Sequence, residues 1–235
     1  MIDLHDKRIL ITGATDGLGL AIAKELARHN AHLIVHGRTE EKVKKTVSEL
    51  QSLGAAKIDE IVCDLTQTEQ IEKVFSEIDS LDVLINNAGI WFEGNTIDAT
   101  QEKIIELTKV NMLAPLLITR IVLPKLLTAD FGQILNVVSL DGTTIPYEYF
   151  NTFYVATKHA LHGFTESLAK EFYKKNLRVM GYYPGGMDTK LFTKSGVKRE
   201  NEPWMFDPQE SAEAIAFMLS RDKSVNVKRM DLVKQ

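Results

Sequence analysis

The chain has 235 residues, of which 44% are hydrophobic and 26% charged, a composition that is ordinary for a globular protein with one core. Its formal net charge of −4 argues against nucleic acid and against anionic membrane surfaces as partners. Cys63 is the single cysteine, so an internal disulfide and a cysteine-based metal site are excluded.

Short apolar runs alternate with amphipathic stretches along the whole chain. Strands are predicted over residues 8–12, 31–36, 57–63, 81–86, 133–139, 177–183 and 225–233. Helices are predicted over residues 18–30, 40–53, 68–78, 100–127 and 153–176, and a last helix follows residue 207. The alternation predicts an α/β protein with a doubly wound parallel sheet of about seven strands, helices on both faces and a single domain over residues 1–235.

Two helix starts carry capping signals. Thr39 is the expected N-cap of the helix over residues 40–53. Asp207 is the expected N-cap of the last helix, with Pro208 at its first helical position and Glu210 completing a capping box.

Three glycines, Gly13, Gly17 and Gly19, lie between the first predicted strand and the first predicted helix. Glycine lets the backbone turn tightly and approach a phosphate, and the helix N-terminus supplies unpaired N–H donors and a partial positive charge. The spacing GxxxGxG therefore indicates a dinucleotide site, although an ordinary turn can also hold three glycines. Asp16 is an unexpected neighbour for a phosphate, and a helix-capping role explains it better.

The turn also resembles a known family motif, and further motifs follow it in order. TGxxxGxG over residues 12–19 is similar to that of the short-chain dehydrogenase/reductase superfamily, in its short single-domain subgroup. The later matches are Asn86-Asn87-Ala88-Gly89 (NNAG), Asn111, Ser139, Tyr154 and Lys158 (YxxxK), and Pro184, Gly185 and Thr189 (PGxxxT). The resemblance covers residues 7–189 and implies a Rossmann fold, a nicotinamide cofactor and interconversion of a carbonyl and an alcohol. The residues expected to contact the cofactor are Gly13, Thr15, Asp16, Gly17, Leu18, Gly19, Arg38, Asp64, Leu65, Asn87, Ala88, Gly89, Tyr154, Lys158, Pro184, Gly185 and Thr189.

Tyr154 and Lys158 are the expected proton-transfer pair. Carbonyl reduction needs a hydride on carbon and a proton on the developing alkoxide, and a tyrosine can supply the proton. A nearby cation stabilises the tyrosinate, and residues four apart share one face of a helix. A surface Tyr and Lys on an amphipathic helix would give the same spacing, so the assignment depends on the surrounding motifs.

Ser139 and Asn111 complete the expected catalytic group. The resemblance gives Ser139 the role of hydrogen-bonding the substrate oxygen, although a serine that caps the next turn is the alternative. It gives Asn111 the role of holding a water near Lys158, and a buried amide that stabilises the helix is the alternative. Ser139 and Tyr154 are 15 residues apart, slightly more than is usual in the family, which predicts a small insertion between them.

The end of the second predicted strand favours NADP(H) over NAD. An acid there would bind the ribose 2′-hydroxyl of NAD, whereas an arginine suits the 2′-phosphate of NADP. The sequence places Arg38 there, with His36 as a possible helper when protonated, and the first acid is Glu40 in the next helix. Arg38 as an ordinary solvated loop residue is the alternative. Asp64 resembles the family residue that binds the adenine, although turn chemistry alone would also place an Asp there.

The residues that would contact the substrate are less clearly indicated by the sequence. Three segments, 90–95, 140–153 and 187–206, are expected at the carboxyl ends of the strands, the last as a substrate-binding loop. Their aromatic residues form either an apolar pocket or local packing: Trp91, Phe92, Tyr147, Tyr149, Phe150, Phe153, Phe192 and Trp204. The cations of the last segment either meet an acidic substrate or are solvated: Lys190, Lys194, Lys198 and Arg199.

The expected partner is a small carbonyl or alcohol substrate, and no nucleic acid, membrane or metal is expected. The charged segment Met1–Lys7 and the lack of ~18 consecutive uncharged apolar residues predict a cytoplasmic protein without signal peptide or membrane helix. Apolar positions on more than one face of two helices predict a homodimer or homotetramer: Leu116, Leu117, Ile121, Leu161, Phe164 and Leu168. A regulator that senses NADP without catalysis is the alternative function, and it predicts damage to Tyr154, Lys158 or Ser139, all of which are intact.

Overall fold

The computed structural model describes residues 1–53, 55, 57–146 and 150–235. Its sheet is parallel and has seven strands in the order β3-β2-β1-β4-β5-β6-β7, which confirms the predicted doubly wound sheet. The strands are β1 (Arg8–Ile11), β2 (His32–Gly37), β3 (Lys57–Val62), β4 (Val83–Asn86), β5 (Gly132–Val137), β6 (Leu177–Pro184) and β7 (Arg229–Leu232).

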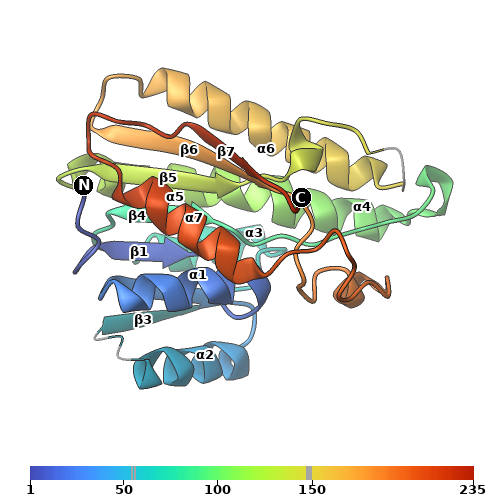
Figure 1. Cartoon of the computed structure of the whole chain (residues 1–235), viewed down its shortest axis with the longest axis horizontal. Coiled ribbons are helices and arrows are strands. Elements are labelled where there is room, and N and C mark those ends of the chain that lie inside the picture. The colour runs from blue at the N-terminus through green and yellow to red at the C-terminus, as the bar shows by residue number, and fades with distance from the viewer. Residues whose placement is uncertain (54, 56, 147–149) are drawn as a thin grey trace.

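Helices cover both faces of the sheet (Figure 1). The α-helices are α1 (Gly17–Arg28), α2 (Glu40–Ser52), α3 (Thr68–Phe75), α4 (Gln101–Thr108), α5 (Ala114–Thr128), α6 (Thr152–Glu171) and α7 (Pro208–Ser220). The other helical segments are η1 (Thr96–Asp98), η2 (Lys109–Leu113), η3 (Leu140–Gly142) and η4 (Thr193–Ser195).

Alternate residues of each strand enter two separate cores, because successive side chains of a strand point to opposite faces. In β1, Ile9 and Ile11 pack with apolar residues of α1, α2 and α7. Leu10 packs on the other side with residues of α3, α5 and α6. Continuous apolar strands are therefore what a sheet covered on both faces requires.

Several predicted element ends are wrong by a few residues, for local reasons. The first helix ends at Arg28 because Asn30 adopts a left-handed conformation with φ 53°. The helix expected to reach residue 176 ends at Glu171, and Lys174 beyond it has φ 61°. In the predicted 225–233 strand, only Arg229–Leu232 pairs with β6.

The two capping predictions have different outcomes. The Asp207 side chain accepts a hydrogen bond from the Gln209 backbone N–H at 2.8 Å, which confirms its N-cap role. The return bond expected from Glu210 is not among the hydrogen bonds of the described residues. Thr39 occupies the N-cap position of α2, but its side chain forms no capping hydrogen bond.

The predicted helix over residues 100–127 is one continuous run, α4–η2–α5, with a π-helical turn at Lys109–Leu113. By length and composition this run, Gln101–Thr128, has an 18-residue window that would pass as a membrane span. Half of that window is buried inside the protein, and Ile118, Val122 and Leu126 pack in the core under the sheet. Its apolar character is therefore explained by core packing.

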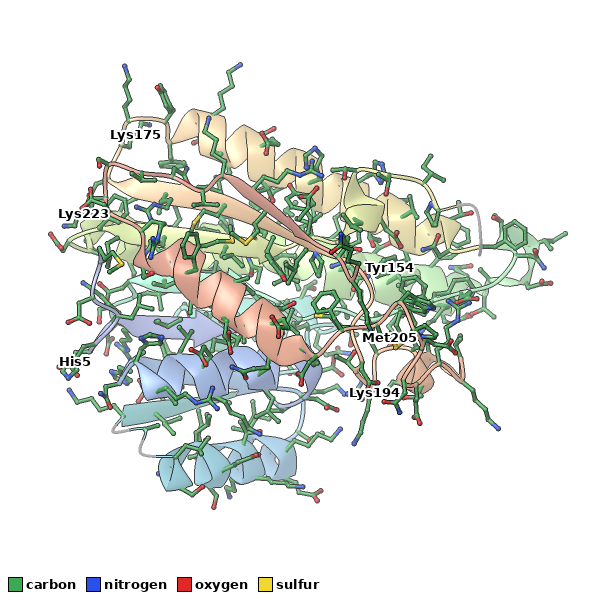
Figure 2. All side chains as sticks on the ribbon, viewed as in Figure 1. His5, Tyr154, Lys175, Lys194, Met205 and Lys223 are labelled. Atoms are coloured by element: carbon green, nitrogen blue, oxygen red, sulfur yellow. The ribbon has the colours of Figure 1, made fainter. Side chains whose placement is uncertain are left out.

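All seven strands point their carboxyl ends in one direction, toward the right of Figure 1, where the segment 187–206 lies. Figure 2 shows Tyr154, Lys194 and Met205 at this end and His5, Lys175 and Lys223 at the other. The candidate site is built at the carboxyl ends.

Candidate active site at the carboxyl ends of the strands

The glycine turn after β1 has a left-handed backbone at two positions, a conformation that favours glycine. Gly13 and Gly17 have φ values of 67° and 49°. A Cβ on Gly19 would lie 2.1 Å from the Gly13 carbonyl oxygen, so any side chain there would force the turn apart. The turn thus brings the N-terminus of α1 to the surface of a cavity with bare backbone facing it.

Thr12 and Asn87 lock this turn to the end of β4. The Thr12 hydroxyl oxygen accepts the backbone N–H groups of Asn87 and Ala88, both at 3.0 Å. The Asn87 side-chain amide donates to the Thr12 and Gly13 carbonyl oxygens at 2.8 and 3.3 Å. Asn87 therefore holds the glycine turn in shape, in addition to lining the cavity. Thr12 was not selected from the sequence, although it opens the TGxxxGxG motif.

His36 has a structural role, and the expectation that it helps bind a phosphate when protonated is wrong. Its side chain is buried, and its Nδ1 accepts the Gly13 backbone N–H at 3.0 Å. The proton must then lie on Nε2, which faces the Cys63 carbonyl oxygen at 3.1 Å. Burial lowers the pKa of His36 to about 4, against the raising effects of that hydrogen bond and of Asp64. A neutral His36 fixes the glycine turn from the side of β2.

Arg38 and Asp64 lie where the sequence predicts, at the ends of β2 and β3. Arg38 is exposed and lines the cavity. Glu40, the nearest acid after it, is paired with Lys44 of its own helix at 2.5 Å. Asp64 also lines the cavity, and its carboxylate accepts from the backbone and hydroxyl of Thr66 at 3.0 and 2.8 Å, which is the turn chemistry given as its alternative.

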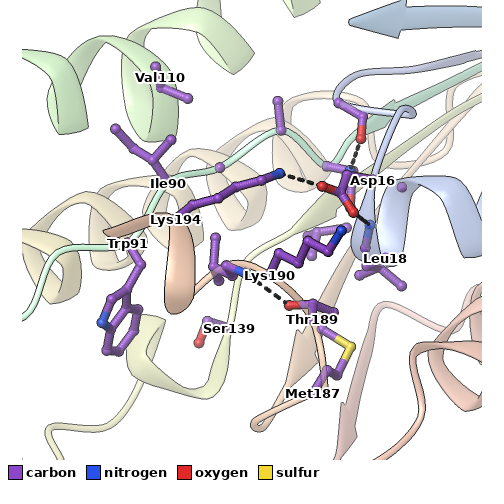
Figure 3. Close-up of a pocket in the computed structure, with 18 of the residues that line it drawn as sticks. Asp16, Leu18, Ile90, Trp91, Val110, Ser139, Met187, Thr189, Lys190 and Lys194 are labelled. Carbon is purple, nitrogen blue, oxygen red and sulfur yellow. Dashed lines mark hydrogen bonds and ion pairs between the residues drawn. The ribbon is translucent and has the colours of Figure 1, made fainter. Parts of the chain in front are cut away.

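One cavity of about 1130 Å³ joins these groups. Figure 3 shows part of its lining, including Asp16, Ser139 and Thr189. Every residue expected at the cofactor lines it, from Gly13 to Thr189, and so does Ser139. The cavity continues past Trp91, Phe192 and Trp204, so it has room beyond the glycine turn for a second molecule.

Tyr154 and Lys158 lie together on α6, almost fully buried, with 5% and 4% of their surfaces exposed. The Lys158 ammonium donates to the Val137 carbonyl oxygen at 3.0 Å and lies 5.7 Å from the centre of the Tyr154 ring. Burial lowers the pKa of Lys158 to about 8, and the charge of Asp141 opposes this. This geometry differs from that of a surface Tyr and Lys on an amphipathic helix.

Ser139 follows β5 in a backbone conformation that is rare for a residue with a side chain, with φ 134°. Its hydroxyl oxygen accepts the Asp141 backbone N–H at 3.2 Å and so caps η3, the alternative role foreseen for it. The strained backbone is a reason to look for a function, because such strain concentrates at active sites.

Comparisons with known proteins show the family to which the chain belongs. A sequence profile of the short chain dehydrogenase family matches residues 7–200. The chain belongs to the short-chain dehydrogenase family. It is 32% identical to a 3-oxoacyl-acyl-carrier-protein reductase of Rickettsia bellii, over 95% of this chain and 93% of that protein.

Two solved structures of similar fold are themselves complexes with the cofactor type expected. An alcohol dehydrogenase from Thermococcus sibiricus, complexed with 5-hydroxy-NADP, has a TM-score of 0.87 and 26% identity, with 97% of this chain and 96% of that chain covered. An actinorhodin polyketide ketoreductase with NADPH has a TM-score of 0.85 and 26% identity, with 97% and 95% covered.

In this short-chain dehydrogenase, Asn111 lies apart from the cavity lining. It sits in the π-helical turn η2, and its side chain clamps the backbone of Ile90: it accepts the N–H at 2.8 Å and donates to the carbonyl at 2.9 Å. A Cβ on Gly89 would lie 3.6 Å from the Asn111 amide oxygen and 3.8 Å from the Lys158 nitrogen. Asn111 and Lys158 therefore both lie close to Gly89. The Asn111 side chain is also a buried amide with backbone partners, as the alternative to a catalytic role expected.

Of the aromatic residues expected near the substrate, Trp91, Phe192 and Trp204 line the cavity. Trp91 packs against the Tyr154 ring at 4.4 Å between centres and against Phe192 at 5.0 Å. Phe92 and Phe153 pack against each other instead, and Phe150 is exposed. Tyr147 and Tyr149 lie outside the described residues.

Two cations of the segment 187–206 are paired with acids. The Lys194 ammonium contacts the Asp16 carboxylate at 2.6 Å (Figure 3), and Arg199 contacts Glu93 at 2.6 Å. Asp16 also caps α1 by accepting the Gly17 N–H at 2.8 Å, which confirms its capping role. Burial opposes ionisation of Asp16, but the hydrogen bond and charge of Lys194 hold its pKa below the usual value. These pairs connect the segment to the glycine turn and to the loop after β4.

Proposed function

We propose that this chain is an NADP(H)-dependent oxidoreductase that interconverts a carbonyl and an alcohol, with Tyr154 as general acid and base. The observation that carries the proposal is the position of Tyr154, Lys158 and Ser139 on the same cavity as the glycine turn and Arg38. The relatives that act on oxo groups and alcohols support the same class of reaction.

The residues present fit a dinucleotide. The glycine turn leaves no space for a Cβ at Gly19, and the N-terminus of α1 offers N–H groups and a partial positive charge to a diphosphate. Arg38 would bind a 2′-phosphate, and Asp64 and Leu65 would contact the adenine, because all three line the cavity. When bound, the nicotinamide supplies or accepts the hydride.

The protein's own groups then handle the proton. In reduction, the Tyr154 hydroxyl donates its proton to the developing alkoxide and Ser139 donates a hydrogen bond to the same oxygen. The Lys158 ammonium stabilises the tyrosinate that remains. Asn111, by fixing Ile90 beside Gly89, positions the wall of the site. The segment 187–206 covers the substrate.

A panel of aldehydes and ketones, followed by the absorbance of NADPH with NADH as control, tests the proposal. We expect oxidation of NADPH with at least one apolar or aromatic ketone, because Trp91, Phe192 and Trp204 line the substrate end. Tight NADPH binding with no turnover on any member would contradict the proposal and favour an NADP-sensing regulator.

The choice of cofactor depends on Arg38. Arg38→Ala should weaken NADPH binding by about 1.5–3 kcal/mol, the contribution of a charge-assisted hydrogen bond, which is a ~10- to 150-fold rise in Kd. The affinity for NADH should stay the same, as should both affinities in the exposed control Arg120→Ala. Calorimetric titration measures all four. If Arg38→Ala weakens the binding of NADPH and NADH equally, the arginine supports its loop and does not bind the 2′-phosphate.

We also propose a homodimer or homotetramer, on a smaller surface than the sequence predicted. Ile121, Leu161 and Leu168 are buried in the protein's own core, so they do not contribute to an exposed face. Leu116, Leu117 and Phe164 remain partly exposed on α5 and α6. Light scattering at micromolar concentration should give a mass of two or four chains, and a single-chain mass would end this proposal.

A further inference from the structure

Trp91 is a buried indole that the mechanism above does not use. It lies in the loop after β4, lines the cavity and has 4% of its surface exposed. Its ring packs on the Tyr154 ring, with 4.4 Å between the centres and 56° between the planes. A carbonyl oxygen that takes the Tyr154 proton must lie within hydrogen-bond distance of that hydroxyl, at about 2.6–3.2 Å. A substituent on the carbonyl carbon is then within reach of the Trp91 ring.

Two more aromatic side chains extend this surface toward the mouth of the cavity. Phe192, in the segment 187–206, packs edge-on against Trp91, with 5.0 Å between the ring centres. Trp204, in the same segment, packs edge-on against Phe192 at 5.8 Å and is 42% exposed. A Cβ on Gly186 would lie 1.8 Å from the Trp204 ring, so this indole packs directly on the glycine backbone. These three side chains form an aromatic wall that runs from the catalytic ring toward solvent.

The helix α4 brings a cation to this end of the cavity, together with an acid. Leu107 of α4 packs in the same apolar cluster as Trp91 and Phe192. Lys103 and Glu106 of α4 line the cavity, and their ammonium and carboxylate groups lie 2.8 Å apart. The two charges therefore compensate each other beside the aromatic wall.

The second cation of this end, Arg199, is paired as well. Its guanidinium contacts the Glu93 carboxylate at 2.6 Å, and the two side chains are 23% and 19% exposed. Arg199 and a further acid, Glu202, line the cavity. Among the described residues at this end, the cations are therefore matched by acids, and Glu202 adds a negative charge. An anionic ligand would meet no excess of positive charge here, and it would have to displace a carboxylate from its cation.

The lysines of the segment 187–206 that line the cavity lie near the glycine turn instead. The Lys194 ammonium contacts the Asp16 carboxylate at 2.6 Å, and the charge of Lys190 acts on the same carboxylate (Figure 3). Asp16 caps α1, so both lysines belong to the cofactor end of the cavity. They do not supply a positive charge at the aromatic wall.

We propose that the substrate is an uncharged aryl ketone or the corresponding alcohol, and that Trp91 is the specificity-determining residue beside its carbonyl carbon. The proposal rests on the proposed function, because it names the substrate of the same site. In reduction the ketone gains the hydride of NADPH and the proton of Tyr154, which gives a secondary alcohol and NADP⁺. The aryl ring packs against the aromatic wall, where ring–ring contacts stabilise a pair beyond the area that they bury.

Binding to the complex with NADP⁺, which cannot reduce a ketone, tests the substrate class without turnover. The compounds para-acetylbenzamide and para-acetylbenzoate have the same shape and differ in charge, whereas acetophenone and cyclohexyl methyl ketone differ in the aromatic character of the ring. We expect Kd to be at least about tenfold lower for the amide than for the carboxylate. It should be about two- to tenfold lower for acetophenone than for cyclohexyl methyl ketone. Ligand-observed NMR titrations measure these values, and equal or reversed values in either pair would overturn the proposal.

Trp91→Leu tests the specificity-determining residue. The smaller side chain opens space beside Tyr154, and benzophenone carries a second ring on its carbonyl carbon. The ratio of kcat/KM for benzophenone to that for acetophenone should therefore rise at least about tenfold. Trp91→Phe keeps an aromatic ring and should give an intermediate ratio. Phe217→Leu, which changes an exposed aromatic side chain of α7, is the matched control and should leave the ratio unchanged.

The affinity for NADPH shows whether each variant is folded, and it should be unchanged in all of them. If Trp91→Leu does not bind NADPH, the ratio in Trp91→Phe decides. An unchanged ratio in the folded Trp91 variants would overturn the role of Trp91. If the wild-type protein reduces no ketone but binds the amide more tightly than the carboxylate, the proposed function fails and the ligand class stands. If it reduces ketones but binds both equally, only the substrate class fails.

Discussion

Tyr154→Phe should lower kcat for carbonyl reduction at least about 100-fold, the lower end of what a general acid contributes. The change removes only the hydroxyl and keeps the ring that packs against Trp91. NADPH binding should survive, because the glycine turn and Arg38 lie elsewhere in the cavity. Stopped-flow and steady-state measurements with a substrate from the panel give both quantities.

The matched control is Tyr173→Phe, an exposed tyrosine just beyond α6 that should leave kcat unchanged. In the direction of alcohol oxidation, the rise of the wild-type rate with pH should disappear in Tyr154→Phe, because the base that causes it is gone. A Tyr154→Phe enzyme with near wild-type turnover, and with chemistry shown to be rate-limiting by deuterated NADPH, would rule out the assigned proton donor.

Lys158→Met should also lower kcat at least about 100-fold, and it should weaken NADPH binding as well. We propose that the lysine stabilises the tyrosinate and, as the resemblance implies, also holds the nicotinamide ribose. Lys170→Met, an exposed lysine in the last turn of the same helix, is the control and should change neither quantity.

The pH dependence of kcat distinguishes the two roles of Lys158. Burial lowers the pKa of Lys158 to about 8, against the opposing charge of Asp141. The wild-type kcat for carbonyl reduction should therefore fall as pH rises above that value, because the lysine loses its charge. Lys158→Met should lack this fall, because nothing remains to titrate. A variant that loses NADPH affinity but keeps kcat at saturating cofactor would limit the lysine to binding.

The sequence predicted both the parallel sheet and the meeting of the motifs at one edge of it, for a simple reason. Apolar runs such as that around Leu10 alternate with amphipathic helices, and this period fixes a parallel sheet with two covered faces. In such a sheet all carboxyl ends lie on one side, so motifs as distant as Gly13 and Thr189 had to meet there.

The features missed from the sequence depend on contacts between distant residues. His36 was misjudged because its position beside Arg38 suggests a ligand, whereas only the structure shows its burial between Gly13 and Cys63. Asp16 and Lys194 are 178 positions apart in the sequence, so no local sequence pattern predicts that they pair.

The π-helical turn at Asn111 and the burial of Asp141 were not predicted from the sequence, for different reasons. The π-helical turn around Asn111 interrupts a run whose sequence period is that of an ordinary helix. Asp141 resembles any loop acid until its burial and its bond to Asn151 are known.

The central claim is that this protein transfers a hydride directly between NADPH and a carbonyl carbon while Tyr154 supplies the proton. A single turnover with NADPH deuterated at the transferring position, analysed by mass spectrometry, tests it most directly. We expect one deuterium on the carbinol carbon of the product with wild-type protein, and at least about 100-fold slower appearance of the same product with Tyr154→Phe. An alcohol without deuterium on that carbon, or an equal rate in the two proteins, would contradict the claim.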